Sequence, residues 1–345
     1  MQKLNKWLLN NIFGMSLFLA LSGISFQFVY MYDFMNTGGS KWISLIFNYG
    51  YANFNFFRAD VFEFKFNIEE SSYSSMSYLN FVFYILFLIS VIVYKLSRFK
   101  ESKVLKFCYS FLFLFALIAM LFRLYYLLLN TQPGNEMIVF SLLYFVKAIV
   151  LFYVCYLYLN SWKSQRIYID TEKVILPDFK SFTLKRAEWY QRLMHYILDI
   201  FLIMSIFSVY IFDFNFRGLV SSLELAVGEH FAATIIFFVF SSFYFLVFEG
   251  FFKATPAKYL SQTSVVNLNN EVVSFSNVLG RTLCRRIPFD AFSFFGKLGW
   301  HDSLAYTTVA KQEREPFKYR AIYIVFLIAL IALFLYKCMD EFRIF

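Results

Sequence analysis

Four ionisable residues recur at helical spacing where a long apolar run begins. They are Glu188, Arg192, His195 and Asp199, which follow one another at intervals of four, three and four residues. An α-helix has about 3.6 residues per turn, so these intervals place the four side chains on one face. Within a membrane, such a face could hold a proton or a cation, with Asp199 as the titrating group. It could also be a buried polar stripe that holds neighbouring helices together.

Two further charged residues lie in apolar surroundings. Lys147 occupies the middle of FSLLYFVKAIVLFYV, at about the depth expected for Asp199, and we predict that these two side chains pair. The alternative is that the long Lys147 side chain extends to the membrane surface. Glu249 ends another apolar run and precedes a basic segment. The sequence therefore predicts a polar intramembrane cluster of Glu188, Arg192, His195, Asp199, Lys147 and Glu249.

The elements that position these residues are long apolar segments. Apolar residues make up 60% of the 345-residue chain, against about 45–50% in an ordinary soluble domain. A helix needs about 20 apolar residues to cross a membrane. We therefore predict an all-α, polytopic integral membrane protein with about seven transmembrane helices. The seven segments are 8–31, 77–96, 104–129, 137–160, 189–212, 227–249 and 319–337.

Lysine and arginine are unevenly distributed between the connecting segments. Segment 95–106 has five of them, 163–186 has six and 253–320 has ten, whereas 213–226 has one. Basic residues concentrate in the cytoplasmic loops of membrane proteins. We therefore predict that the N-terminus and the basic segments are cytoplasmic, and that the loop 33–76 and the C-terminus lie outside. This distribution accounts for the net charge of +9 without nucleic-acid binding.

One polar stretch, KSQRIYIDTEKVILPDFKSFTLKR, interrupts the apolar pattern and divides the chain. On this basis we predict four parts. They are a four-helix transmembrane region over 1–162, a cytoplasmic linker over 163–186, a membrane domain over 187–311 and a C-terminal transmembrane helix over 312–345.

The cytoplasmic segment between the last two predicted spans has its own pattern. Thr263–Val266 and Val272–Phe275 are β-prone runs that flank three asparagines, which predicts a small β-hairpin. Tyr306–Ala310 could add a third strand. Residues 276–296 mix arginines with large apolar side chains, which predicts an amphipathic helix at the inner surface of the membrane.

Motifs for catalysis or for holding a cofactor are absent from the sequence. The four cysteines form no paired motif and the three histidines are scattered, so we expect neither a metal site nor a disulfide. The sequence has no phosphate-binding loop, nucleophile elbow or zinc-protease motif. We expect no cofactor and no enzymatic activity.

Several motifs in the C-terminal half occur in an order that resembles the RDD family of bacterial integral membrane proteins. The family is named for one arginine and two aspartates, which match Arg192, Asp199 and the Asp302 of GWHDSLAYTTVA. FEGFFKATPAKYL and VLGRTLCRRIPFDAFSFFG match two further motifs, although Ala257 stands where the family usually has glycine. The resemblance covers about residues 185–311 and implies a location in the bacterial plasma (inner) membrane. The N-terminal half resembles no family that we recognise.

The resemblance leaves two functions open. The first is a membrane interaction or assembly factor within a larger complex, with membrane lipid and a membrane protein as partners. The alternative is a cation/proton transporter that uses Asp199, because some members of the family are reported as antiporters; its ligand would be a monovalent cation or a proton. Four basic residues are expected either to bind anionic lipid headgroups or to meet the acidic residues: Lys258, Arg281, Arg285 and Arg286.

Overall fold

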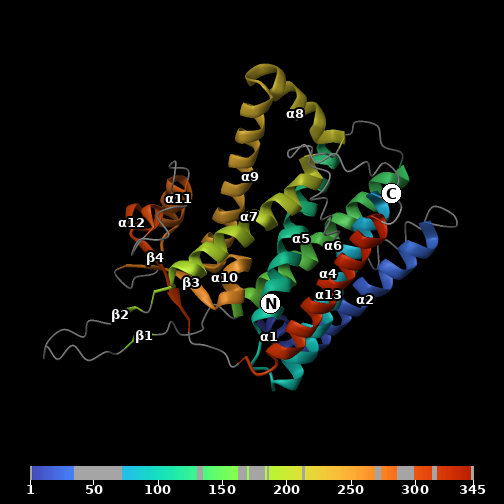
Figure 1. Cartoon of the computed structure of the whole chain (residues 1–345). Coiled ribbons are helices and arrows are strands. Elements are labelled where there is room, and N and C mark those ends of the chain that lie inside the picture. Colours follow the sequence, from blue (N-terminus) through green and yellow to red (C-terminus); the bar gives the residue numbers. More distant parts are fainter. Residues whose placement is uncertain are drawn as a thin grey trace, which may run out of the picture.

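The structure is a computed structural model of the chain. It describes residues 2–34, 72–129, 135–161, 169–170, 183–184, 186–211, 214–268, 273–285, 299–312 and 317–342. Within these residues the fold is mostly helical, with two short antiparallel strand pairs (Figure 1). Most of the predicted outer loop and Arg286 lie outside the described residues.

Each of the seven predicted apolar segments coincides with a helix. Three of these helices contain stretches that are long and apolar enough to cross a membrane, namely Lys103–Leu121, Ser141–Ser161 and Glu229–Phe252. The prediction of a helical protein with membrane-spanning character is confirmed, whereas the number of seven crossings stays a prediction. The seven helices are α2 (Ile12–Phe34), α4 (Ser72–Leu96), α5 (Lys103–Leu129), α6 (Asn135–Ser161), α7 (Trp189–Ile211), α9 (Glu229–Phe252) and α13 (Arg320–Phe342).

Among the described residues up to 252, two helices were not expected. A short α1 (Gln2–Asn10) precedes α2, and α8 (Phe214–Val227) occupies the segment 213–226, for which the sequence predicts a loop. The break falls instead at Gly228, whose φ of 84° is a conformation that side-chain-bearing residues rarely adopt. Figure 1 shows α8 and α9 meeting at a sharp angle at the top of the molecule.

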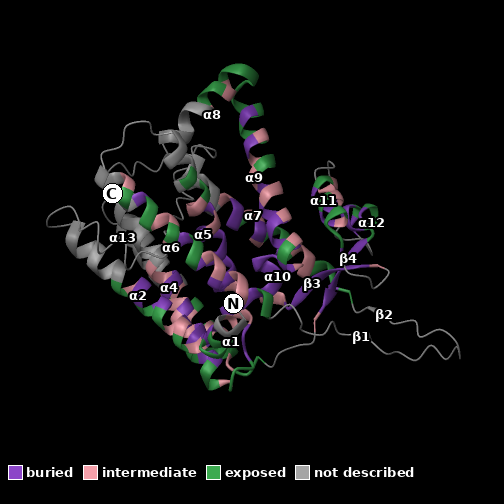
Figure 2. Ribbon diagram, turned by 180° about the vertical axis from the view of Figure 1, so that it is seen from behind, coloured by how far each residue is buried: buried purple, intermediate pink, exposed green. Residues whose placement is uncertain are grey.

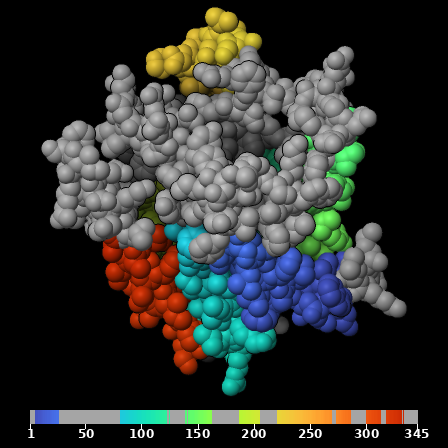
Figure 3. Space-filling view, turned by 90° about the vertical axis from the view of Figure 1, so that its right-hand side faces the viewer, coloured from blue at the N-terminus to red at the C-terminus, as the bar shows by residue number. Residues whose placement is uncertain are grey.

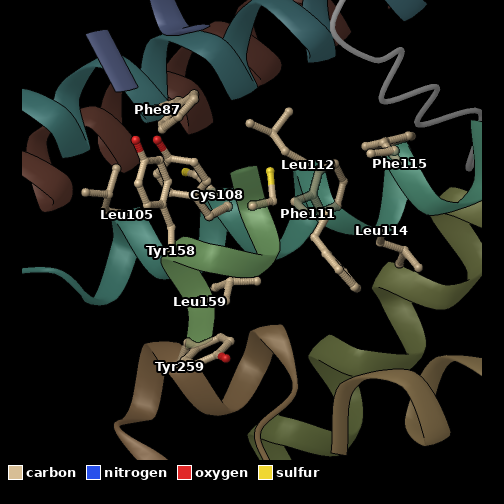
Figure 4. Packing of buried hydrophobic residues seen from close by; sticks show 14 of the residues in the cluster. Phe87, Leu105, Cys108, Phe111, Leu112, Leu114, Phe115, Tyr158, Leu159 and Tyr259 are labelled. Atoms are coloured by element: carbon tan, nitrogen blue, oxygen red, sulfur yellow. The ribbon is translucent and has the colours of Figure 1, made fainter. Parts of the chain in front are cut away.

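The apolar core is centred on α5, which packs against helices from both halves of the chain. Tyr109 of α5 is hydrogen-bonded to Ser16 of α2 at 2.7 Å. The ring of Phe113 lies 5.0 Å from the ring of Phe252 in α9, measured between centroids. Figure 4 shows the α5 side chains beside Tyr158 of α6, with α10 (Pro256–Ser261) below them. The N-terminal helices and the C-terminal half therefore share one core.

One face of the molecule is formed by α2, α4 and α13, which adjoin one another (Figures 1 and 3). Tyr319, just before α13, donates a hydrogen bond from its Oη to the carbonyl oxygen of Leu96 at the end of α4, at 3.2 Å. The hydroxyl of Tyr158 in α6 likewise donates to the carbonyl of Leu8 in α1, at 3.0 Å. These bonds connect helix ends that are far apart in the sequence.

The predicted β-hairpin between Thr263–Val266 and Val272–Phe275 is wrong, because the first strand has a different partner. Strand β3 (Thr263–Asn267) pairs antiparallel with β4 (Thr307–Lys311), so that Val265 lies opposite Val309. The predicted third strand is therefore the true partner. Phe275 begins a helix, because the Ser274 hydroxyl accepts a hydrogen bond from the backbone N–H of Asn277, and the Ser274 N–H donates one to Oδ1 of Asn277.

Two short helices complete this C-terminal element: α11 (Phe275–Cys284) and α12 (Trp300–Leu304). The predicted linker contributes a second small strand pair, β1 (Ile169–Asp170) with β2 (Thr183–Leu184). It then joins the edge of β4, where the N–H of Ala187 donates to the carbonyl of Val309 at 2.8 Å. Figure 1 shows α11, α12 and β4 to one side of α9.

Candidate functional site

Asp199 lies on α7 and is fully buried. Its carboxylate accepts hydrogen bonds from the hydroxyls of Tyr244 and Thr255, each at 2.8 Å. The ammonium group of Lys258 lies 4.0 Å away. A buried carboxylate is destabilising unless it is hydrogen-bonded or paired, and these three groups from α9 and α10 meet that need.

Glu249, near the end of α9, is the centre of the charge network. Its Oε1 accepts hydrogen bonds from Lys258 Nζ at 2.9 Å and from Arg285 Nη2 at 2.6 Å. Arg281 Nε lies 3.1 Å from Oε2 as an ion pair, although the angle makes no hydrogen bond. Glu249 is 0% exposed, so one buried carboxylate lies among three cations.

The third carboxylate, Asp302, belongs to α12 and forms an ion pair with Arg281 of α11. The same guanidinium donates from Nη1 to the hydroxyl of Thr307 at 3.0 Å. The side chains of Asp199, Glu249 and Asp302 thus face those of Lys258, Arg281 and Arg285. Burial lowers the pKa of Lys258, while the Glu249 and Asp199 carboxylates oppose this effect by favouring its charged form.

The other residues of the predicted stripe on α7 contact different elements. His195 is hydrogen-bonded to Ser261, the last residue of α10, and at 3.3 Å to Thr263, the first residue of β3. Glu188 is half exposed and accepts a hydrogen bond from Lys311 of β4 at 2.5 Å. The stripe therefore joins α7 to β4 at one end, to α10 and β3 in the middle, and to α9 at Asp199.

The arginine and the two aspartates singled out from the sequence line one cavity. Arg192, Asp199 and Asp302 surround it together with His195 and His301. Its volume of about 30 Å³ has room for water molecules and not for an organic solute. Residues more than 100 positions apart in the sequence thus line the same cavity, from α7 on one side and from α11, α12 and β4 on the other.

The predicted pair between Lys147 and Asp199 is wrong. Among the described residues, the polar contacts of Asp199 are with Tyr244, Thr255 and Lys258. Lys258 takes the position beside Asp199 that the prediction gave to Lys147. Lys147 belongs to α6, and its ammonium group lies 6.0 Å from the centroid of the Tyr144 ring.

Three of the four predicted basic residues, Lys258, Arg281 and Arg285, meet acidic residues in the charge network. Lys258 is 3% exposed and Arg281 1% exposed, so neither is available to a lipid headgroup. Arg285 combines its bond to Glu249 with a position 3.8 Å above the ring of Phe245. Arg286 lies outside the described residues.

Ala257, which stands where the family usually has glycine, is in the first turn of α10 and is buried. Positive φ values at this connection belong to Lys253 and Gln262 instead. A need for positive φ therefore does not explain a small residue at position 257. Close packing does, because Thr255, Pro256 and Ala257 are all buried at the point where α10 approaches the core.

Two contacts of Asp199 were missed by the sequence analysis. Thr255 precedes the proline that starts α10, a helix-start pattern that could have drawn attention to it. Tyr244 lies in an aromatic run with no distinguishing signal. Among the described residues, no three His, Cys, Asp or Glu side chains are placed to hold a metal ion.

Comparison with known proteins gives one match. The family model described as the RDD family matches residues 186–343. No curated protein and no solved structure matches the chain. The matched range includes Arg192, Asp199 and Asp302, which line the cavity described above. Residues 186–343 are therefore similar to the RDD family of membrane proteins.

Proposed function

We propose that this protein is a non-enzymatic membrane interaction or assembly factor, in which the RDD region is a rigid joint. The joint is the charge cluster of Asp199, Glu249, Asp302, Lys258, Arg281 and Arg285. What it holds in place is the α11–α12 element, and the apolar face of that element is the observation that carries the proposal.

The cluster supports a structural role because its charges are matched within it. Each carboxylate has at least one cationic neighbour, and Glu249 has three. Removing one partner from a buried ion pair typically costs about 3–5 kcal/mol, because it leaves the other charge without compensation. A network of this kind resists rearrangement, which suits a fixed joint.

The α11–α12 element presents large apolar side chains outwards. On α11 they follow one another at intervals of four residues, and on the opposite side Val278 packs with Leu246 of α9. Figure 2 shows the exposed faces of both helices. Large exposed apolar patches are typical of interaction surfaces. The exposed residues, between 39% and 66% accessible, are Phe275, Leu279, Leu283, Trp300, Leu304 and Tyr306.

This face is close to the membrane, because Leu246 and Glu249 belong to the candidate span Glu229–Phe252. We propose that its occupant is an apolar helix of a partner membrane protein. Such a helix would extend the packing that already joins Val278 to Leu246.

The test is co-purification from membranes at the natural level of expression. The native chain is expected to retain one membrane protein at a fixed ratio. The double variant Leu279→Ser, Leu283→Ser is expected to lose it, whereas Ser303→Ala, at an exposed polar position on α12, keeps it. A native chain that is monodisperse without a partner, or whose α11–α12 face contacts only lipid, would count against the proposal.

A cation/proton transporter is the second candidate, favoured by the position of Asp199. Its carboxylate lines the water-sized cavity, and its nearest cation, Lys258, is closer to Glu249 than to Asp199. Under this alternative, Na⁺- or K⁺-driven proton movement in proteoliposomes would disappear in Asp199→Asn while the variant remained folded. Absence of flux in the native protein would leave the interaction factor as the proposal.

A further inference from the structure

A second pocket lies where the two halves of the chain meet. It has a volume of about 470 Å³ and is bordered by the starts of α5 and α13 and by residues of α7 and α10. Its lining includes Lys103, Arg320, Gln191, Gln262 and Phe317. The size suits a small ligand. None of the six charged residues of the cluster lines this pocket, so its binding properties can be tested separately from the proposed function.

Positive charge converges on this pocket. Lys103 is the first residue of α5 and Arg320 the first residue of α13. The start of a helix adds unpaired N–H groups and a partial positive charge of about +0.5. The ammonium of Lys103 lies 3.8 Å from the centroid of the Phe317 ring, which fixes it at the pocket wall. Two cations and two helix starts make an environment that favours an anion.

A buried donor in the same pocket points to a ligand. Gln262 is 9% exposed, and its Nε2 has no hydrogen-bond partner among the residues that the structure describes. Its backbone is fixed, because its carbonyl accepts from Gln312 N–H at 2.8 Å and its φ is 54°. A buried amide donor without a partner is costly, and an anionic oxygen in the pocket would satisfy it.

Among the described residues, the acidic Glu101 contacts the start of α13. Glu101 accepts a hydrogen bond from the backbone N–H of Tyr319 through Oε2, at 3.4 Å. It does not line the pocket. Its carboxylate thus holds the start of α13 against the turn between α4 and α5, and this brings Arg320 and Lys103 to the same pocket.

The position of the pocket relative to the membrane indicates which class of anion it binds. Lys103 begins the candidate membrane span Lys103–Leu121, so the pocket lies at the depth where lipid phosphates are found. Basic pockets between membrane helices bind lipid headgroups. We propose that this pocket binds a phosphate group, carried by a membrane phospholipid or by a soluble phosphate.

The experiment uses the full chain in mild detergent with phosphatidylglycerol, phosphatidylcholine and inorganic phosphate as probes. Native mass spectrometry counts the bound molecules, and titration gives the dissociation constants. Each basic residue is expected to contribute a factor of about five. Lys103→Gln combined with Arg320→Gln should therefore weaken binding about 30-fold.

Two further variants make the result specific. Lys318→Gln changes an exposed neighbour of Arg320 outside the pocket lining and should leave binding unchanged. Gln262→Glu keeps the size of the side chain but repels an anion, so it should weaken binding while the melting temperature is kept. This variant also decides the case if the double variant does not fold.

The probes distinguish the two sources of phosphate. A single phosphatidylglycerol that is retained in preference to phosphatidylcholine identifies a lipid, whereas binding of inorganic phosphate that neither lipid displaces identifies a soluble phosphate. The proposal is overturned if none of the probes binds, or if the pocket variants and Lys318→Gln weaken binding equally.

Discussion

At the scale of single residues, Glu249 forms more ion pairs than any other carboxylate in the described structure. It is fully buried and lies within 3.1 Å of Lys258, Arg281 and Arg285. Glu249→Gln would leave these cations without their common counter-charge. We expect a loss of about 3–5 kcal/mol in the free energy of unfolding, measured by denaturant titration of the purified protein in detergent.

The matched control is Glu188→Gln, which breaks a single ion pair between the half-exposed Glu188 and the buried Lys311. Solvent screens the charge of Glu188, and only one cation loses its partner, so this variant should lose less stability than Glu249→Gln. If Glu249→Gln and Glu188→Gln unfolded alike, the buried cluster would not be the joint that we propose.

The sequence was informative about the residues of the cluster but not about their partners. Helical spacing placed Glu188, His195 and Asp199 on one face, and the structure agrees. Lys258 was expected to meet either lipid or acid, and Lys147 was assigned to Asp199 by depth alone. Depth does not determine which helices are neighbours, and that is why the assignment failed.

At the scale of elements, the start of α11 depends on Ser274. Its hydroxyl accepts from Asn277 N–H, and the Asn277 amide also donates to the carbonyl of Ala305 at 3.0 Å. Ser274→Ala should therefore loosen α11, at a cost of about 0.5–2 kcal/mol. Hydrogen–deuterium exchange is expected to become faster in residues 275–284, whereas Ser303→Ala leaves it unchanged. Equal exchange in both variants would refute the role of the cap.

The packing of α2 on α4 provides a second test. Gly23 faces the ring of Tyr84 so closely that an added Cβ would overlap the ring atoms. Gly23→Ala is therefore expected to cost about 1–3 kcal/mol of stability, measured as thermal unfolding in detergent.

Gly14 on the same helix is the control, because an added Cβ there meets nothing within 4 Å. Gly14→Ala should be neutral or stabilising by up to about 1 kcal/mol. In a Tyr84→Ala background, Gly23→Ala should lose its effect. A persistent loss in that background would mean that the ring is not the cause.

Hydropathy predicted the elements better than their pairing. All seven apolar segments coincide with helices, because a long apolar run is a local property. The β-partner of Thr263–Asn267 lies about 40 residues further on, beyond α11 and α12. The sequence instead suggested a hairpin with the nearby run Val272–Phe275. This pairing does not form, because Ser274 caps α11 and Phe275 is the first residue of that helix.

At the scale of the whole molecule, the distribution of basic residues predicts which side of the membrane each connection faces. Cysteines can be introduced at Lys100, which is exposed, and at Glu224, which is partly exposed, in a chain whose native cysteines are replaced. The two positions are expected to differ in their labelling from outside the cell. A membrane-impermeant maleimide added to intact cells should label position 224 and not position 100. Labelling of both positions, or of position 100 alone, would contradict the predicted orientation.

The molecule combines a shared apolar core with a buried charge cluster, and we propose that this cluster holds the α11–α12 face beside α9. Four helices contribute to the charge cluster through Asp199 on α7, Glu249 on α9, Arg281 on α11 and Asp302 on α12. This arrangement supports a protein that positions a surface rather than one that moves a solute.

Photo-crosslinking within the native membrane tests that claim most directly. A photoreactive amino acid is placed at Leu279, on the exposed apolar face, and at Ser303 as the control. We predict one discrete protein adduct at Leu279 and none at Ser303. The account would be contradicted if Leu279 gave only lipid adducts while the purified protein exchanged cations for protons in a manner that depended on Asp199.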